Sequence, residues 1–183
     1  TLRGAGHSIL LANSDGDVDL DAEHIRLLSR RRVDGLILSL ESESNPSTLL
    51  ALSDLRVPVV LLDREIADVK GPRVTAVLCD HRTGVCDVVG DMIEAGHRRV
   101  ALITGPDTIR PSRERLAGYL DAHRLAQIPV IDDLFRLGGH SEVFGRKQTL
   151  DLLNMTEPPT ALLAGGVQLG NGALQALSEL AIW

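Results

Sequence analysis

The chain has 183 residues, of which 44% are hydrophobic and only 2% aromatic, and its formal net charge is −6. This length suits one ordinary domain or two small lobes, whose core must be built from Leu, Val, Ile and Ala. The acidic balance argues against a segment that wraps a nucleic-acid backbone. No apolar run approaches the ~20 residues that a membrane span needs, so we expect no membrane association. We also expect a cytoplasmic protein.

Strand-like and helix-like segments alternate along the chain. The first is a short apolar run, His7–Ala12, which ends in turn residues; a helical pattern with Ile25 and Leu28 on one side follows it and ends at Arg30–Arg32. Strands are expected over Leu36–Leu40, Pro58–Leu62, Val74–Leu78, Val100–Thr104, Phe135–Leu137 and Thr160–Ala164. Further helices are expected over Pro46–Leu55 (capped by Asn45), Arg82–Ala95, Ser112–Ala126, Glu142–Leu153 and Gly172–Leu180.

This alternation, with connections of a few residues, predicts an α/β fold with one or two doubly wound parallel sheets. The one loose linker is Glu65–Arg73, which is rich in charge and contains Gly71-Pro72. Thr1–Gly6 looks like the end of a helix with no strand before it, and the chain stops just after a helix. We therefore expect the sheets to be incomplete and both ends to be cut.

A metal site is not expected. The acidic stretch Asn13–Asp17, with Asp19 and Asp21 after it, resembles a calcium loop at first sight. An EF-hand that started at Asp15 would need Gly and Glu where this chain has Leu20 and Arg26. We interpret the stretch as a turn and a helix cap, with acidic side chains at the helix N-terminus.

No enzyme signature is present either. Neither phosphate-binding glycine loop, GxGxxG or GxxxxGK[ST], occurs, and GxSxG and HExxH are also missing. We therefore expect no cofactor, no catalytic residues and no enzymatic activity. The basic runs Arg30–Arg32 and Arg98–Arg99 are interpreted as solvated helix ends. Cys79 and Cys86 are expected to be small buried side chains.

Polar residues follow the strands at places where ligands commonly bind, outside the carboxyl ends of a parallel sheet. Asp63 and Arg64 end one strand, and they are either a surface ion pair or the polar lip of a cleft. Arg115 lies just inside a helix that follows the Gly105-Pro106 turn. It is either an exposed helix residue or a ligand contact, because a guanidinium can hold an anion or a pair of sugar hydroxyls.

Four strings carry a family resemblance: PVVLLDR at Pro58–Arg64, VLCDHRTG at Val77–Gly84, GHRRVALITGP at Gly96–Pro106 and RERLAGY at Arg113–Tyr119. With these strings the chain resembles the effector-binding core of the LacI/GalR family of bacterial transcription repressors. RVDGLIL upstream and PTALLA and GAL downstream extend the resemblance over nearly the whole chain.

The resemblance implies two Rossmann-like lobes of the type I periplasmic binding protein kind, with the effector in the cleft between them. Residues 1–80 would form the N-terminal lobe, without its first strand, and residues 81–183 the C-terminal lobe, without its last part. The family implies a sugar or a related small molecule as effector. It also implies a homodimer and allosteric control of operator DNA through a helix-turn-helix headpiece that this chain lacks.

The resemblance also implies the site. Arg115 matches the effector-contacting arginine of the family's RLAG motif, and Asp63 would lie opposite it across the cleft; Arg64, Ser39 and His140 are the further candidates. Two departures alter the expected pocket. His140 stands where relatives often have an aromatic residue, and Gly166-Val167 stands where they have an acid.

Two other functions share the α/β architecture, so the fold alone cannot decide between them. A periplasmic sugar-binding protein of an ABC transporter is the main alternative, and the sequence that precedes Thr1 would distinguish it by a secretory signal. A nucleotide-binding dehydrogenase is the other, and it would need the phosphate-binding glycine loop that this chain lacks.

Overall fold

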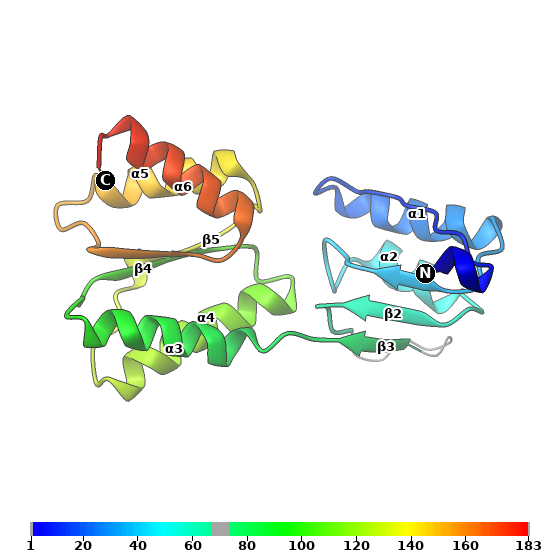
Figure 1. The fold of residues 1–183 in the computed structure, drawn as a ribbon, viewed down its shortest axis with the longest axis horizontal. Helices are drawn as coiled ribbons and strands as arrows, with labels where there is room; N and C mark the ends of the chain where they lie inside the picture. The colour runs from blue at the N-terminus through cyan, green and yellow to red at the C-terminus, as the bar shows by residue number, and fades with distance from the viewer. Residues whose placement is uncertain (1, 67–73, 183) are drawn as a thin grey trace. The chain divides into compact units, whose positions relative to one another are not determined.

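The computed structural model describes residues 2–66 and 74–182, so most of the predicted linker Glu65–Arg73 lies outside the described residues (Figure 1). The chain divides into two compact units, unit 1 over Thr1–Val77 and unit 2 over Leu78–Trp183. Each contains one three-stranded sheet in which every pairing is parallel. The α/β fold with two parallel sheets is thereby confirmed, whereas the functional lobe boundary after Asp80 stays a prediction.

Unit 1 packs two helices on its sheet. Its elements are a 3-10 turn (Leu2–Ala5), α1 (Val18–Arg30), β1 (Leu36–Leu38), α2 (Pro46–Ser53), β2 (Val59–Leu62) and β3 (Val74–Val77), with strand order β1-β2-β3. Ile25 of α1, Leu52 of α2 and Leu61 of β2 are at most 1% exposed and form the centre of one core. The helices begin where expected, because Asp17 and Asn45 accept backbone N–H bonds at their N-termini.

Unit 2 repeats the strand–helix alternation three times after an opening helix. Its elements are α3 (His81–Glu94), β4 (Val100–Thr104), α4 (Arg110–Leu125), a 3-10 turn (Asp132–Leu134), β5 (Phe135–Leu137), α5 (Glu142–Leu153), β6 (Ala161–Ala164) and α6 (Val167–Glu179). The strand order is β5-β4-β6, so β4 is central.

The side chains of β4 enter two separate cores. Val100 and Leu102 pack with residues of α3 and α4, while Ala101 and Ile103 pack with Leu152 of α5 and residues of α6 and the 3-10 turn. Figure 1 shows α3 and α4 on one side of this sheet and α5 and α6 on the other. A strand covered on both faces has no polar side to present, which explains its continuous apolar sequence.

Glycines let the helices of unit 2 approach closely. A Cβ atom on Gly118 of α4 would overlap the backbone carbonyl of Arg82 in α3. Likewise, a Cβ on Gly172 of α6 would overlap the carbonyl of Glu142, and one on Gly145 of α5 would overlap the carbonyl of Leu169. Both helix pairs are therefore packed backbone to backbone, and any larger residue would force them apart.

An ion cluster also joins α3 to α4. Arg82 Nε donates to Asp121 Oδ2 at 2.6 Å, and Arg124 Nη2 donates to Asp121 Oδ1 at 2.9 Å. These two hydrogen bonds, from Arg82 first, lower the pKa of the Asp121 carboxyl to about 2. The cluster therefore stays charged over the whole physiological range of pH.

The structure corrects the predicted starts of two helices and the predicted burial of the two cysteines. The last helix begins at Val167 rather than Gly172, because Gly170 and Gly172 are weak helix formers that hide its first turns in the sequence. The helix expected from Ser112 begins at Arg110, with Pro111 in its first turn. Cys79 is exposed and Cys86 half-buried, so neither is the fully buried side chain that we predicted.

We predict that Gly118→Ala destabilises unit 2, because the added methyl group meets the α3 backbone. The expected loss is about 1–3 kcal/mol in the free energy of unfolding, the usual cost of overpacking. Gly90→Ala in α3 is the matched control, since a Cβ there meets nothing within 4 Å. The control is expected to gain about 0.5–1 kcal/mol of helix propensity. Urea unfolding followed by circular dichroism measures both, and equal effects would contradict the close-packing argument.

Candidate functional site

In unit 2, the loops that follow the three strands meet at the carboxyl edge of the sheet. The N–H of Gly138, just after β5, donates to the carbonyl of Thr104 at 3.2 Å. The N–H of Gly165, just after β6, donates to the carbonyl of Ile103 at 2.7 Å. Both loops are thus held beside the end of β4, where ligands of open α/β sheets bind.

The His140 side chain lies against two glycines of this edge. A Cβ atom on Gly105 would overlap the imidazole ring, and one on Gly166 would lie 3.6 Å from its Nδ1 atom. His140 is nevertheless exposed to solvent. The absence of side chains at positions 105 and 166 therefore leaves room for the ring, part of which is exposed to solvent.

Arg115 lies at the same edge, half-buried on α4. Its Cδ atom is 3.0 Å from the position that a Cβ on Gly165 would take, and Thr104 Oγ1 is 2.7 Å from that same position. Arg115, Thr104 and Gly165 are therefore neighbours. The site joins a cation with five N–H donors to a hydroxyl group and an imidazole.

Two buried hydroxyl groups belong to the segments that form this edge. The side chains of Thr104 and Ser112 are 0% exposed, and neither hydroxyl oxygen has a hydrogen-bond partner among the described residues. Buried polar groups are normally paired, so each such group calls for an explanation. We did not predict either as a site residue, and the only sequence signal is their position, at the end of β4 and in the first turn of α4.

The helices α4 and α6 both begin at this edge without a capping side chain within the described part of the chain, at Ile109 and Gly166. By contrast, α5 is capped by Ser141, whose hydroxyl accepts from the Phe144 N–H at 3.1 Å. The first N–H groups of a helix have no partner inside it and favour anions and oxygen atoms. Both helix ends therefore add donors to the edge.

In unit 1, the predicted residues also gather at a carboxyl edge. Ser39 follows β1 and is exposed, whereas Asp63 and Arg64 follow β2 and are half-buried. Arg64 donates from Nε to the carbonyl of Leu40 and from Nη1 to the carbonyl of Asp63, the latter at 2.9 Å. The guanidinium thus ties together the loops that follow the two strands.

The charge of Arg64 is set by opposing effects. Burial lowers the pKa of its guanidinium from the ordinary value, while the nearby carboxylates of Glu43, Glu41, Asp63 and Asp21 raise it. An arginine stays protonated under all ordinary conditions. A positive charge that is partly withdrawn from water and surrounded by acids is therefore held in place at this edge.

The structure thus places Ser39, Asp63 and Arg64 at one edge of unit 1, and Arg115 and His140 at one edge of unit 2. Their contact with a ligand stays a prediction. The structure adds Thr104 and Ser112 to the candidate residues of unit 2, and the sequence analysis identified neither of them.

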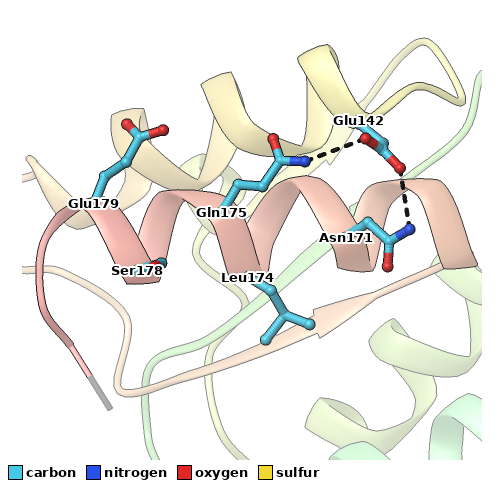
Figure 2. Close-up of a pocket in the computed structure, with 6 residues that line it drawn as sticks. All are labelled: Glu142, Asn171, Leu174, Gln175, Ser178 and Glu179. Carbon is cyan, nitrogen blue, oxygen red and sulfur yellow. Dashed lines mark hydrogen bonds between the residues drawn. The ribbon is translucent and has the colours of Figure 1, made fainter.

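A surface depression elsewhere on unit 2 is a weaker candidate. It is lined by Glu142 and by five residues of α6, namely Asn171, Leu174, Gln175, Ser178 and Glu179 (Figure 2). Glu142 accepts from Asn171 Nδ2 at 3.0 Å and from Gln175 Nε2 at 3.2 Å. The carboxylate of Glu142 and the two side-chain amides of the depression therefore bond to one another and are already paired.

Residues 1–180 match the protein family described as periplasmic binding proteins and sugar binding domain of LacI family. The chain belongs to this family. The match confirms the resemblance carried by the GHRRVALITGP and RERLAGY strings.

Individual members of the family agree with this assignment. The HTH-type transcriptional repressor PurR of Klebsiella pneumoniae is 29% identical over 97% of this chain and 51% of its own length. A sugar-binding transcriptional regulator of the LacI family from Escherichia coli, solved with phosphate, is 26% identical, with a TM-score of 0.71 over 99% of this chain and 64% of that one. The transcription regulator CcpA of Lactococcus lactis, 24% identical, shares the fold with a TM-score of 0.87 over 100% of this chain and 65% of its own.

The chain spans about half the length of the curated relatives that it matches. Within residues 2–66 and 74–182, no helix combines the length and the apolar character that crossing a bilayer requires.

We predict that Gly105→Ala displaces the His140 ring, because the new methyl group would occupy the position of the imidazole. The measurement is the NMR cross-relaxation between the ring protons of His140 and the Hα protons of Gly166, which we expect to disappear. Gly139→Ala is the control, since a Cβ there meets nothing within 4 Å, and it should keep the signal. An unchanged signal in Gly105→Ala would show that the ring does not depend on this glycine.

Proposed function

We propose that the chain is the effector-binding core of a transcriptional regulator of the LacI family, and that its effector is a sugar or a related small molecule. The observation that carries this proposal is the polar carboxyl edge of unit 2. Arg115 and His140 lie at the same edge as the hydroxyl of Thr104. The description of the family to which the chain belongs names sugar binding. Asp63, Arg64 and Ser39 are the residues we propose from unit 1.

The residue types favour a ligand rich in oxygen. Arg115 supplies a planar array of N–H donors that suits paired hydroxyls, a carboxylate or a phosphate. Asp63, which accepts only, suits the hydroxyl protons of a polyol. The uncapped N-termini of α4 and α6 favour oxygen atoms and anions in the same way. A related structure was solved with phosphate, which supports including phosphorylated sugars among the candidates.

For the whole protein we propose a cytoplasmic repressor that binds operator DNA through a helix-turn-helix headpiece outside residues 1–183. The repressor PurR, to which the chain is similar, is named as HTH-type. The net charge of −6 fits a segment that does not itself contact DNA. Effector binding then changes operator affinity through a coupling free energy between two distinct sites.

A periplasmic solute-binding protein remains the alternative, because the family description includes such proteins. The relatives in hand are transcriptional regulators, which favours the first proposal. The gene sequence before Thr1 separates them, since one function needs a helix-turn-helix segment and the other a secretory signal. Regulators rather than enzymes among the relatives also support our proposal that the chain is not an enzyme.

We predict that Arg115→Ala weakens effector binding by ~1.5–3 kcal/mol, the scale of a hydrogen bond to a charged group. This corresponds to roughly a tenfold to hundredfold or greater rise in Kd. Calorimetric titration of the full-length protein with a panel of monosaccharides and monosaccharide phosphates first identifies the ligand and then compares the variants.

Arg113→Ala is the matched control, an exposed arginine of the same helix that bonds to the carbonyl of Asp107 at 3.0 Å. It should leave the affinity unchanged. In Arg115→Ala operator binding should persist while its response to the effector is lost. Equal affinities of wild type and Arg115→Ala would mean that Arg115 is a structural helix residue.

We also predict that the full-length protein is a homodimer, because a palindromic operator mirrors a two-fold symmetric protein. Sedimentation velocity at micromolar concentration should give the mass of two chains. A protein that sediments only as a monomer would contradict this assembly.

A further inference from the structure

The helix α6 of unit 2 begins without an acidic residue at its N-terminus. It follows Gly166, which has no capping side chain, and its first turn contains no acid. The first hydrogen bond inside the helix runs from the N–H of Gly170 to the carbonyl of Gly166 at 2.9 Å. The N–H groups of Val167, Gln168 and Leu169 therefore have no acceptor within the helix, and they lie at the positive end of its dipole.

Two basic side chains lie against the loop that leads into this helix. Residues 158–178, which form β6 and most of α6, contain no charged side chain of their own. The Arg115 Cδ atom is 3.0 Å from the position that a Cβ on Gly165 would take, and His140 Nδ1 is 3.6 Å from the position of a Cβ on Gly166. The helix end is therefore neutral in its own sequence, with an arginine and a histidine as neighbours that can donate hydrogen bonds.

A buried hydroxyl group points to a ligand at the same loop, independently of the helix end. Thr104 Oγ1 is 2.7 Å from the position of a Cβ on Gly165, the residue before the start of α6. The Thr104 side chain is 0% exposed, and this oxygen has no hydrogen-bond partner among the described residues. Buried polar groups are normally paired. An oxygen atom of a ligand bound at this loop would be the missing partner.

The other two helices that begin at this edge are less suited to an anion. α5 is capped by Ser141 and already has the carboxylate of Glu142 in its first turn. α4 has no capping side chain, but its first turn contains Pro111, which has no N–H to donate. Of the three, α6 alone combines a first turn with all its N–H donors and the absence of both a cap and an acid.

We propose that the effector is an anionic sugar, and that its phosphate monoester or carboxylate binds at the N-terminus of α6. The anionic group accepts hydrogen bonds from the first N–H groups of the helix, with Arg115, His140 and the Thr104 hydroxyl around it. This inference rests on the proposed function, because it assigns a charge to the effector proposed there. Helix N-termini bind phosphates and carboxylates through these same backbone donors.

Val167 is the residue that leaves this helix end open to an anion. It occupies the first position of α6, and its side chain is 82% exposed. A carboxylate at this position would itself occupy the positive end of the dipole and would repel a second negative charge. An apolar side chain at this place neither pairs with the N–H groups nor repels the ligand.

The test titrates the full-length protein calorimetrically with pentoses and hexoses, their phosphate monoesters and their uronic acids. The wild type should bind an anionic member about tenfold or more tightly than its neutral parent sugar. Val167→Asp should remove this preference and leave the affinity for the neutral sugar unchanged or higher. The variant should fold, because an acid in the first turn stabilises a helix.

Two further variants separate charge from position. Val143→Asp makes the same change in the first turn of α5, where the valine is 79% exposed, and it should keep the preference for the anionic sugar. Val167→Asn adds an uncharged side chain of the same shape as Asp, so its difference from Val167→Asp measures the effect of charge alone.

Equal affinity of the wild type for neutral and anionic sugars overturns the inference, as do equal losses in Val167→Asp and Val143→Asp. Inorganic phosphate that binds as tightly as the sugar phosphates would overturn it in favour of the free ion. Binding of no sugar, neutral or anionic, would instead contradict the proposed function, and the inference with it.

Discussion

The two-sided pairing of β4 is the constraint on which unit 2 depends. Its five residues are 0% exposed, with a parallel strand on each edge and a pair of helices on each face. Because such a strand is buried along its whole length, the chain becomes accessible only where the strand ends, at the carboxyl edge of the sheet. The strand ends at Thr104, and Gly105-Pro106 then turns the chain into α4. The position of the candidate site is therefore fixed by the packing of the strand behind it.

Much of this architecture could be predicted from the sequence because buried parallel strands are short apolar runs bounded by turn residues. The strand Val100–Thr104 and the helix Glu142–Leu153 were predicted with the bounds that the structure gives. The predicted start of α6 was wrong because a tertiary contact, rather than local helix propensity, accounts for the glycine in this helix. Gly172 weakens the helix locally, yet it is the residue that allows α6 to approach the carbonyl of Glu142. Such a contact leaves no mark in local periodicity.

The residues of the candidate site also divide into those that the sequence predicted and those that only the structure shows. Arg115 was predicted from its motif and its place after a strand, and His140 from the family resemblance; the structure brings both to one edge of unit 2. Thr104 and Ser112 were not predicted: Thr104 lies within the GHRRVALITGP string, but nothing in that string marks its hydroxyl, and Ser112 lies in none of the four strings. Their interest comes only from complete burial without a partner in the described residues. The glycines at 105, 165 and 166 were visible in the sequence, but their role as space for Arg115 and His140 was not.

The guanidinium of Arg64 is already held by backbone carbonyls. Arg64 donates through two of its nitrogens to the carbonyls of Leu40 and Asp63, so part of its five-donor fork is committed to joining the ends of β1 and β2. The aliphatic stem of Arg115 lies against Gly165 and Thr104 at the end of β4. A guanidinium committed to backbone carbonyls fixes the shape of an edge more than it selects a ligand. For unit 1 we therefore propose Asp63 and Ser39, rather than Arg64, as the residues that select ligand hydroxyls.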